Sequence, residues 1–197
     1  MPAGPAQGRP PVTSHAAIES AAFALFAAKG FDHTTVDEIA DAAGIGRRTL
    51  FRYFPSKYDI PWGQFGASLD GFRATLDAMP DDLPLWEAVH RGVVSFNTLD
   101  PAHVDQHRHR MRLILGTPGL QAHSFLMYQR WRQVIMDFVA HRRGLEPHDP
   151  LPVAVGHVSL ALALAAYDRW LGSSELGLEA VLDDTLSTLR AFYDVGD

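Results

Sequence analysis

The chain of 197 residues contains no cysteine, which excludes disulfide bridges, cysteine-ligated metal sites and thiol catalysis together. The sequence also lacks the short patterns of common enzyme classes, such as a nucleophile elbow, a phosphate-binding glycine loop or a complete metal-binding set. Positive charge is scarce, with 17 lysines and arginines against 23 acidic residues. We therefore expect a protein that is not an enzyme and that uses no cofactor.

Long uncharged hydrophobic runs are also missing. The most apolar stretch, Leu151 to Leu171, is uncharged only as far as Tyr167 and is interrupted by His157. That length falls short of the roughly twenty residues that span a bilayer, so we expect no membrane segment. Its length and alanine content favour a helix over a strand. A helix that is apolar all round must be covered on every side.

The first residues lack both periodicity and the apolar core of a signal peptide. Four prolines lie among residues 1–12, which predicts a disordered arm there. We expect a cytoplasmic protein, because a signal for export is not apparent.

Basic residues gather in one stretch, Ile45 to Lys57, which contains no acidic residue. If Arg47 to Phe54 form a helix, the helical repeat separates an apolar face from a basic face. Arginines in a first helical turn oppose the helix dipole, so they indicate an external anion. DNA is a suitable anion because the arginine fork matches phosphates and guanine edges, whereas a solvated charged face is the alternative. The basic face would carry Arg48, Thr49 and Arg52.

A second short helix is expected just before this stretch. Thr35 and Glu38 have the spacing of a capping box, and apolar residues follow at helical spacing up to Gly44. Two short helices joined by a tight glycine-containing turn, the second basic outside, are typical of a helix-turn-helix. A preceding helix that begins at Thr13 or Ser14 would complete a three-helix domain at residues 13–57.

A characteristic set of residues occurs here in order and without gaps: Gly30, Phe31, Thr34, Thr35, Val36, Ile39, Ala40, Ala43, Gly44, Leu50, Tyr53, Phe54 and Lys57. With these residues, the segment from Gly30 to Lys57 resembles the DNA-binding domain of the TetR family of bacterial transcriptional regulators. More narrowly, residues 44–63 resemble the regulators found with mycofactocin biosynthesis clusters. Two positions depart from the wider pattern, since Gly46 replaces a capping Ser or Thr and Phe51 replaces a common Tyr.

The resemblance implies an all-α regulator, most simply a repressor, that binds double-stranded operator DNA as a homodimer. It further implies that residues 58–197 form a helical bundle for effector binding and for dimerisation through the last two helices. On the DNA we expect base contacts from Arg47, Arg48 and Thr49, and a contact to bases or phosphate from Arg52. Backbone contacts would come from Thr34, Thr35, Tyr53 and Lys57.

The remaining chain predicts helices at residues 56–79, 85–99, 101–115, 120–143, 151–171 and 175–193, with a stripe on the last that includes Phe192. The family resemblance implies an effector pocket among the middle helices. Its expected lining is aromatic: Trp62, Phe65, Phe72, Trp86, Phe96, Phe125, Tyr128 and Trp131. The subfamily resemblance implies a long-chain acyl-CoA as effector, with an unrelated apolar metabolite as the alternative.

One histidine cluster offers a competing function. His103 and His107 are four residues apart, as are Asp105 and His109, so each pair shares a helix face. A metal-dependent hydrolase or metal sensor is therefore the alternative reading, although a solvated face is commoner and we assign no metal. Interleaved arginines at positions 108, 110 and 112 offer a further use, the binding of the phosphates of a nucleotide-containing ligand.

Overall fold

A computed structural model describes residues 14–194, and describes the side chains of residues 14–189. Within residues 14–194 the regular elements are all helices, which confirms the predicted all-α fold. The chain divides into two compact units, residues 1–63 and 64–197, which we describe separately. The predicted arm at residues 1–12, the alternative cap Thr13 and the side chain of Phe192 lie outside what is described.

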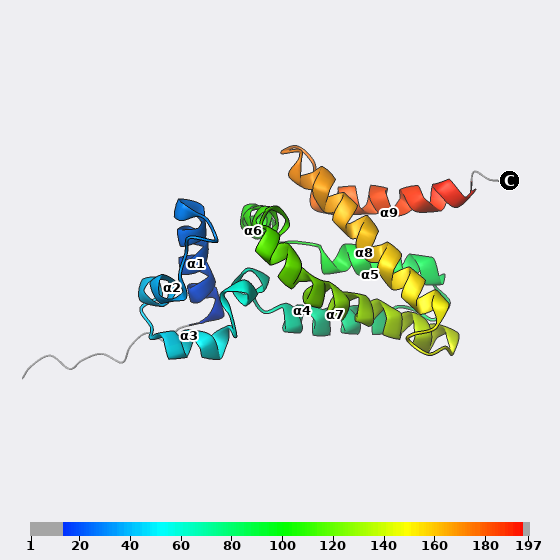
Figure 1. The fold of residues 1–197 in the computed structure, drawn as a ribbon. Helices are drawn as coiled ribbons and strands as arrows, with labels where there is room; N and C mark the ends of the chain where they lie inside the picture. The colour runs from blue at the N-terminus through cyan, green and yellow to red at the C-terminus, as the bar shows by residue number, and fades with distance from the viewer. Residues whose placement is uncertain (1–13, 195–197) are drawn as a thin grey trace, which may run out of the picture. The chain divides into compact units, whose positions relative to one another are not determined.

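The described part of the N-terminal unit contains α1 (His15–Lys29), α2 (Val36–Ala42), α3 (Arg47–Tyr53) and a 3-10 helix, η1 (Lys57–Trp62) (Figure 1). Ser14 begins α1, because its hydroxyl accepts a hydrogen bond from the Ala17 N–H. The predicted capping box at the start of α2 is present, with Thr35 and Glu38 satisfying each other's backbone N–H groups. The apolar core between these helices is made by Ile18, Ala22, Phe26, Phe31, Ile39, Ala40, Leu50, Phe54 and Ile60.

The turn between α2 and α3 depends on a glycine. Gly44 has a φ of 66°, in the left-handed region that other residues rarely adopt, and it ends α2 as predicted. Gly46 then occupies the N-cap position of α3 without a side-chain hydrogen bond. The start of α3 is therefore not capped by a side chain.

The predicted single helix over residues 56–79 is wrong. The structure instead has η1, a break at Gly63 with φ 56°, and then α4 (Phe65–Asp77). Pro61 removes one backbone N–H from the first segment, and Gly63 adopts a positive φ at low steric cost. Because η1 packs against α1, the N-terminal unit extends to Gly63 and not only to Lys57.

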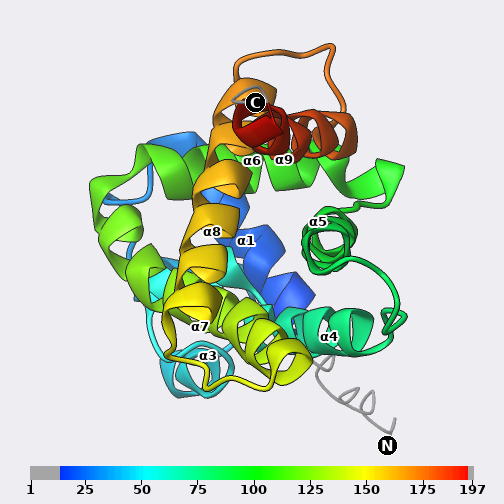
Figure 2. The same ribbon diagram turned by 90° about the vertical axis from the view of Figure 1, so that its right-hand side faces the viewer.

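The C-terminal unit contains α4, α5 (Leu85–Phe96), the 3-10 helix η2 (Pro101–His103), α6 (Val104–Gly116), α7 (Pro118–Arg143), α8 (Pro150–Leu171) and α9 (Leu178–Asp194). Each of the remaining predicted helices is present in the predicted order, with small shifts at the ends. The long helix α7 packs against α4, α6 and α8, and α8 also packs against α9. Figure 2 shows α8 crossing α7 on one side of this unit, with α9 beside its C-terminal end.

Among the residues that the structure describes, those of α7 and α9 make most of the contacts with α8. Gly156 lies so close to α7 that an added Cβ would be 2.9 Å from the Met136 Cγ. On other positions Leu151 and Val158 are 44% and 42% exposed. The described residues of one chain therefore leave part of the apolar surface of α8 open, and its coverage on every side stays a prediction for the dimer. By length and composition α8 also passes a test for a membrane-spanning helix, as core helices of soluble proteins do.

Candidate DNA-binding surface and effector region

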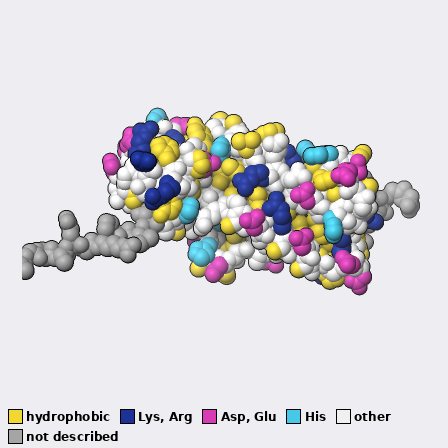
Figure 3. Space-filling model, turned by 90° about the horizontal axis from the view of Figure 1, so that it is seen from below, with side chains coloured by type: hydrophobic (Ala, Val, Ile, Leu, Met, Phe, Trp, Pro, Cys, Tyr) yellow, Lys and Arg dark blue, Asp and Glu magenta, His cyan; other side chains and the backbone are white. Residues whose placement is uncertain are grey.

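Helix α3 has the two faces that the sequence predicts. Leu50 and Phe54 are buried, at 0% and 1% exposure, and they anchor the helix to the N-terminal unit. Arg48 and Arg52 are exposed on α3, and Thr49 is half-buried. Figure 3 looks onto the side of the molecule that carries α3, where Lys and Arg side chains stand beside hydrophobic ones. Helix α3 is thus held by its buried apolar face, and its outer face is basic.

Arg47 has an internal partner that sequence reasoning missed. Its Nη1 donates hydrogen bonds to both carboxylate oxygens of Asp37 on α2, at 2.9 and 3.1 Å. Its guanidinium carbon also lies 5.4 Å from the centre of the Phe51 ring. The anion that the sequence demanded for Arg47 is therefore present within the unit itself. The only sequence signal was Asp37 in the first turn of α2, where an acidic residue is common for another reason.

Two of the expected backbone-contacting residues point into the unit. The Lys57 Nζ donates to the carbonyl oxygens of Phe31 and Thr34, both at 2.9 Å, and lies 4.3 Å from the Phe31 ring centre. Burial lowers the pKa of Lys57. Thr34 is buried, and its Oγ1 donates to the Gly30 carbonyl at 2.8 Å. A phosphate contact by either side chain would have to replace these bonds, so the contacts of Thr34 and Lys57 to the DNA backbone stay predictions.

The other two expected backbone contacts are more accessible. Thr35 is exposed, and its Oγ1 donates to Glu38 Oε2 at 2.7 Å. The bond from Lys29, with the backbone and hydroxyl bonds from Thr35, lowers the pKa of Glu38 to about 2. The half-buried Tyr53 ring packs against His15 at the start of α1, with centroids 4.8 Å apart. Thr35 caps the start of α2, and Tyr53 is the last residue of α3.

Four of the eight aromatic residues predicted for the effector pocket come together in the C-terminal unit. We call them the aromatic cluster; they are Phe65 and Phe72 from α4, Phe96 from α5 and Trp131 from α7. Phe72 lies 4.9 Å from Phe96 and 5.5 Å from Trp131, and Phe65 lies 6.4 Å from Phe96, measured between ring centres. These are ordinary distances for aromatic packing.

Two of the other four predicted pocket residues are exposed. Trp86 is 47% exposed and lies beside His90, and Phe125 is 60% exposed on α7. Trp62 belongs to η1 in the N-terminal unit, while Tyr128 is half-buried on α7. Aromatic rings at helical spacing are visible in the sequence, but the face that neighbouring helices cover is not.

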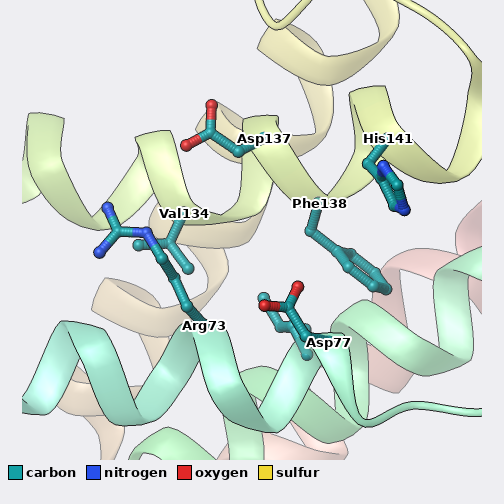
Figure 4. Close-up of a pocket in the computed structure, with 7 residues that line it drawn as sticks. Arg73, Asp77, Val134, Asp137, Phe138 and His141 are labelled. Carbon is teal, nitrogen blue, oxygen red and sulfur yellow. The ribbon is translucent and has the colours of Figure 1, made fainter.

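A separate pocket of about 230 Å³ lies between α4 and α7, and none of the predicted residues lines it (Figure 4). Its apolar part comes from Leu76, Val134 and Phe138. Polar and charged side chains surround that part, with Arg73 and Asp77 on α4 and Asp137 and His141 on α7. This volume is below the ~300–1,000 Å³ of typical sites for drug-sized ligands.

The histidines of α6 do not assemble into a metal site. His107 Nε2 lies 2.8 Å from the Tyr167 hydroxyl, whereas His109 Nδ1 lies 2.8 Å from the Asp105 carbonyl. Among the residues that the structure describes, no group of three or more His, Asp or Glu side chains could hold a metal. Burial, helped by the charge of Arg110, lowers the pKa of His107 to about 4. The ring is therefore neutral at pH 7 and packs against Tyr167.

His107 belongs to a hydrogen-bond chain that joins α6, α8 and α5. Asn97 Nδ2 donates to the Val93 carbonyl, which fixes the orientation of its amide. The Tyr167 hydroxyl then donates to Asn97 Oδ1 at 2.8 Å. The Tyr167 oxygen must therefore accept from His107, which carries its proton on Nε2.

The arginines of α6 also have internal uses. The Arg108 guanidinium lies 4.0 Å from the Trp170 ring centre and donates to the Trp170 and Ser173 carbonyls. Arg112 approaches the Leu171 carbonyl at 3.5 Å. These carbonyls lie at the C-terminal end of α8 and just after it, where cations are favourable. Arg108 and Arg112 thus hold the C-terminus of α8, and their use as a phosphate grip loses its support.

Comparisons with known proteins agree with this geometry. The model of bacterial regulatory proteins of the tetR family matches residues 18–60, and the model described as the MftR C-terminal domain matches residues 83–194. A protein of Mycobacterium tuberculosis named as a candidate mycofactocin biosynthesis transcriptional regulator, MftR, is 42% identical over 194 residues, covering 98% of each chain.

Solved structures show the same fold at lower sequence identity. NalD of Pseudomonas aeruginosa, a repressor of a multidrug efflux pump, aligns over 90% of this chain and 94% of its own, with 22% identity and a TM-score of 0.60. FadR of Thermus thermophilus, solved with lauroyl-CoA, aligns over 90% and 93%, with 20% identity and a TM-score of 0.58. The N-terminal match, the MftR-type C-terminal match and the full-length relative lead to one conclusion: the chain belongs to the TetR family of transcriptional regulators.

Proposed function

We propose that this regulator is a cytoplasmic one-component repressor that binds operator DNA as a homodimer and leaves it when a small apolar effector binds. The observation that carries the proposal is the basic outer face of α3, with Arg48 and Arg52 exposed and Leu50 buried beneath them. A helix anchored in this way and presenting arginines suits the major groove, where arginine recognises guanine.

The proposed DNA contacts are of two kinds, to base edges and to the DNA backbone. Arg47, Arg48 and Thr49, in the first turn of α3, are proposed to contact base edges, and Arg52 either bases or phosphate. Thr35 and Tyr53, which remain partly accessible, are proposed to contact the DNA backbone.

Dimerisation is proposed to use the uncovered side of α8 together with α9. Leu151 and Val158 are exposed about two helical turns apart on α8, so both would expose less apolar surface to water if a second copy covered this side of the helix. A two-fold axis would repeat the same contacts on both subunits and place two recognition helices for successive major grooves, about 34 to 36 Å apart.

The effector is proposed to bind at the aromatic cluster among α4, α5 and α7, with a long-chain acyl-CoA as the specific candidate. The lauroyl-CoA bound by the similar FadR of T. thermophilus supports this class of ligand. Because the rings of Phe72, Phe96 and Trp131 are packed together, an acyl chain would have to separate these helices locally. A ligand that binds such an opened form shifts the population away from the form that matches the operator.

Binding to the DNA upstream of the protein's own gene tests this proposal. The fragment and a scrambled duplex are compared at one fixed salt concentration, with and without lauroyl-CoA. Specific binding that lauroyl-CoA releases supports both the repressor and the effector class. Specific binding without release rejects the acyl-CoA, and failure to bind any DNA rejects the regulator itself.

A further inference from the structure

We infer that Asp37 is a specificity-determining positioning residue, which holds the Arg47 guanidinium in a fixed orientation for reading a base edge. The inference rests on the proposed DNA-binding function. It adds to that function a residue on α2 that makes no base contact itself. The N-terminal unit alone carries the geometry.

The contact crosses from one helix of the helix-turn-helix to the other. Asp37 lies in the first turn of α2, and Arg47 is the first residue of α3. Both hydrogen bonds to the carboxylate use Nη1, at 2.9 and 3.1 Å. The opposite edge of the guanidinium, formed by Nη2 and Nε, therefore remains available as a two-donor fork. Such a fork is what the O6 and N7 atoms of guanine accept.

A second contact, with the Phe51 ring, also limits the motion of the Arg47 side chain. The ring of Phe51, one helical turn further along α3, lies 5.4 Å from its guanidinium carbon, within the range of a cation–π contact. The carboxylate and the ring thus restrict a long side chain that would otherwise rotate freely. The substitution of Phe for the common Tyr at this position keeps the ring that the contact needs.

The pair contributes more to recognition than to folding. The side chains of Arg47 and Asp37 are 60% and 63% exposed, and exposed ion pairs contribute little to stability. Ordering Arg47 before the DNA arrives, in contrast, removes the entropy cost of ordering it at the interface. That cost corresponds to roughly a three- to tenfold change in the affinity for the correct sequence.

A different role for Asp37 predicts a different result. If the carboxylate merely competes with DNA for Arg47, its removal strengthens binding to every sequence. If it positions Arg47, its removal lowers the ratio of specific to nonspecific affinity, whereas the loss of a negative charge alone strengthens both kinds of binding alike and leaves the ratio unchanged.

The test uses the full chain and a duplex that the wild-type protein selects from a randomised DNA pool. The dissociation constants for that duplex and for a scrambled one are measured for Asp37→Ala, Asp37→Asn, Arg47→Ala and the double variant D37A/R47A. Asp41→Ala is the matched control, because it removes the same charge from an exposed position on the same helix. Thermal unfolding of each variant checks that it folds. If Asp37→Ala does not fold, Asp37→Asn takes its place in the binding comparison.

We expect Asp37→Ala to lower the specificity ratio about three- to tenfold, and Asp41→Ala to leave it unchanged. In the Arg47→Ala background, Asp37→Ala should change the ratio no further. An unchanged ratio in Asp37→Ala, with or without a uniform gain in affinity, would overturn the inference. If the wild-type protein selects no sequence from the pool, the proposed function itself fails, which is a separate outcome.

Discussion

The Lys57 ammonium donates a hydrogen bond to the Thr34 carbonyl at 2.9 Å, across 23 residues of sequence. A second bond of equal length goes to the Phe31 carbonyl. Lys57 therefore joins the end of the helix-turn-helix to the turn that precedes α2. In the DNA-free form this side chain is a structural bridge.

From this bridge we predict that Lys57→Met lowers the free energy of unfolding by about 1–3 kcal/mol, since two carbonyls lose a charged donor. Below the melting temperature, the slope of log affinity against log salt for operator DNA should stay unchanged. Denaturant unfolding and binding over a salt series measure the two quantities. Arg52→Ala, at an exposed position, is the comparison. If Lys57→Met instead keeps its stability and its salt slope falls by about one, Lys57 is a phosphate contact.

The contact between α4 and α5 predicts opposite effects for two glycines. A Cβ on Gly92 of α5 would overlap the Leu76 side chain and lie 3.4 Å from Phe72 Cε2. Gly92→Ala should therefore destabilise the protein by about 1–3 kcal/mol through overpacking. Gly71→Ala, where nothing lies within 4 Å, should stabilise it by about 0.5–1 kcal/mol through helix propensity. Urea unfolding compares the two, and equal effects would show that α4 and α5 do not pack closely.

The buried His107 predicts a loss of stability in acid. Its pKa falls from 6.5 to about 4 on folding, so the unfolded chain takes up the proton first. The stability contribution is complete above pH 6.5 and is lost as the pH falls towards 4. At pH 5 the loss amounts to about 2 kcal/mol.

His107→Gln measures the contribution of this histidine to the pH dependence of stability, because glutamine can donate to Tyr167 but does not titrate in this range. We expect the difference in unfolding free energy between pH 7.5 and pH 5.0 to shrink by about 2 kcal/mol in this variant. His141→Gln, at an exposed histidine, is the control. A pH dependence identical to that of the wild type would mean that His107 is not buried as described.

The exposed side of α8 predicts a sensitive position for dimerisation. Val158 is 42% exposed in the single chain, and in the proposed dimer a charge there would be buried without a partner. Val158→Glu should weaken the dimer by about 3 kcal/mol or more, beyond a hundredfold. Sedimentation over a concentration series measures this, with Ala74→Glu at an exposed position of α4 as control. Equal dissociation constants for both variants would place the interface elsewhere.

Local rules predicted local structure well. The Thr35 and Glu38 capping box and the separation of Leu50 from Arg48 follow from spacing along one helix, and both are present. The break at Gly63 was missed because a proline in a first helical turn is normally tolerated. Pro61 and Gly63 both stand at the break, but neither residue alone excludes a continuous helix.

Contacts between distant segments could not be predicted. Phe72 and Phe125 look alike in sequence, yet one is buried and the other is 60% exposed, because neighbouring helices cover only one of the two faces. The same holds for His107, whose partner Tyr167 is 60 residues away, and for Arg47 with Asp37. In each case the burial or the partner depends on how helices pack, which spacing along one helix does not encode.

The central claim is that the basic face of α3 reads DNA sequence, and Arg48→Ala tests it most directly. The affinities of the wild type and the variant are measured for the selected duplex and for scrambled DNA at one salt concentration. We predict a loss of about 1–3 kcal/mol on the selected duplex, a smaller loss on scrambled DNA, and relaxed preference at one base position. An equal loss on both duplexes would contradict the claim, because it would make Arg48 a contact to phosphate alone.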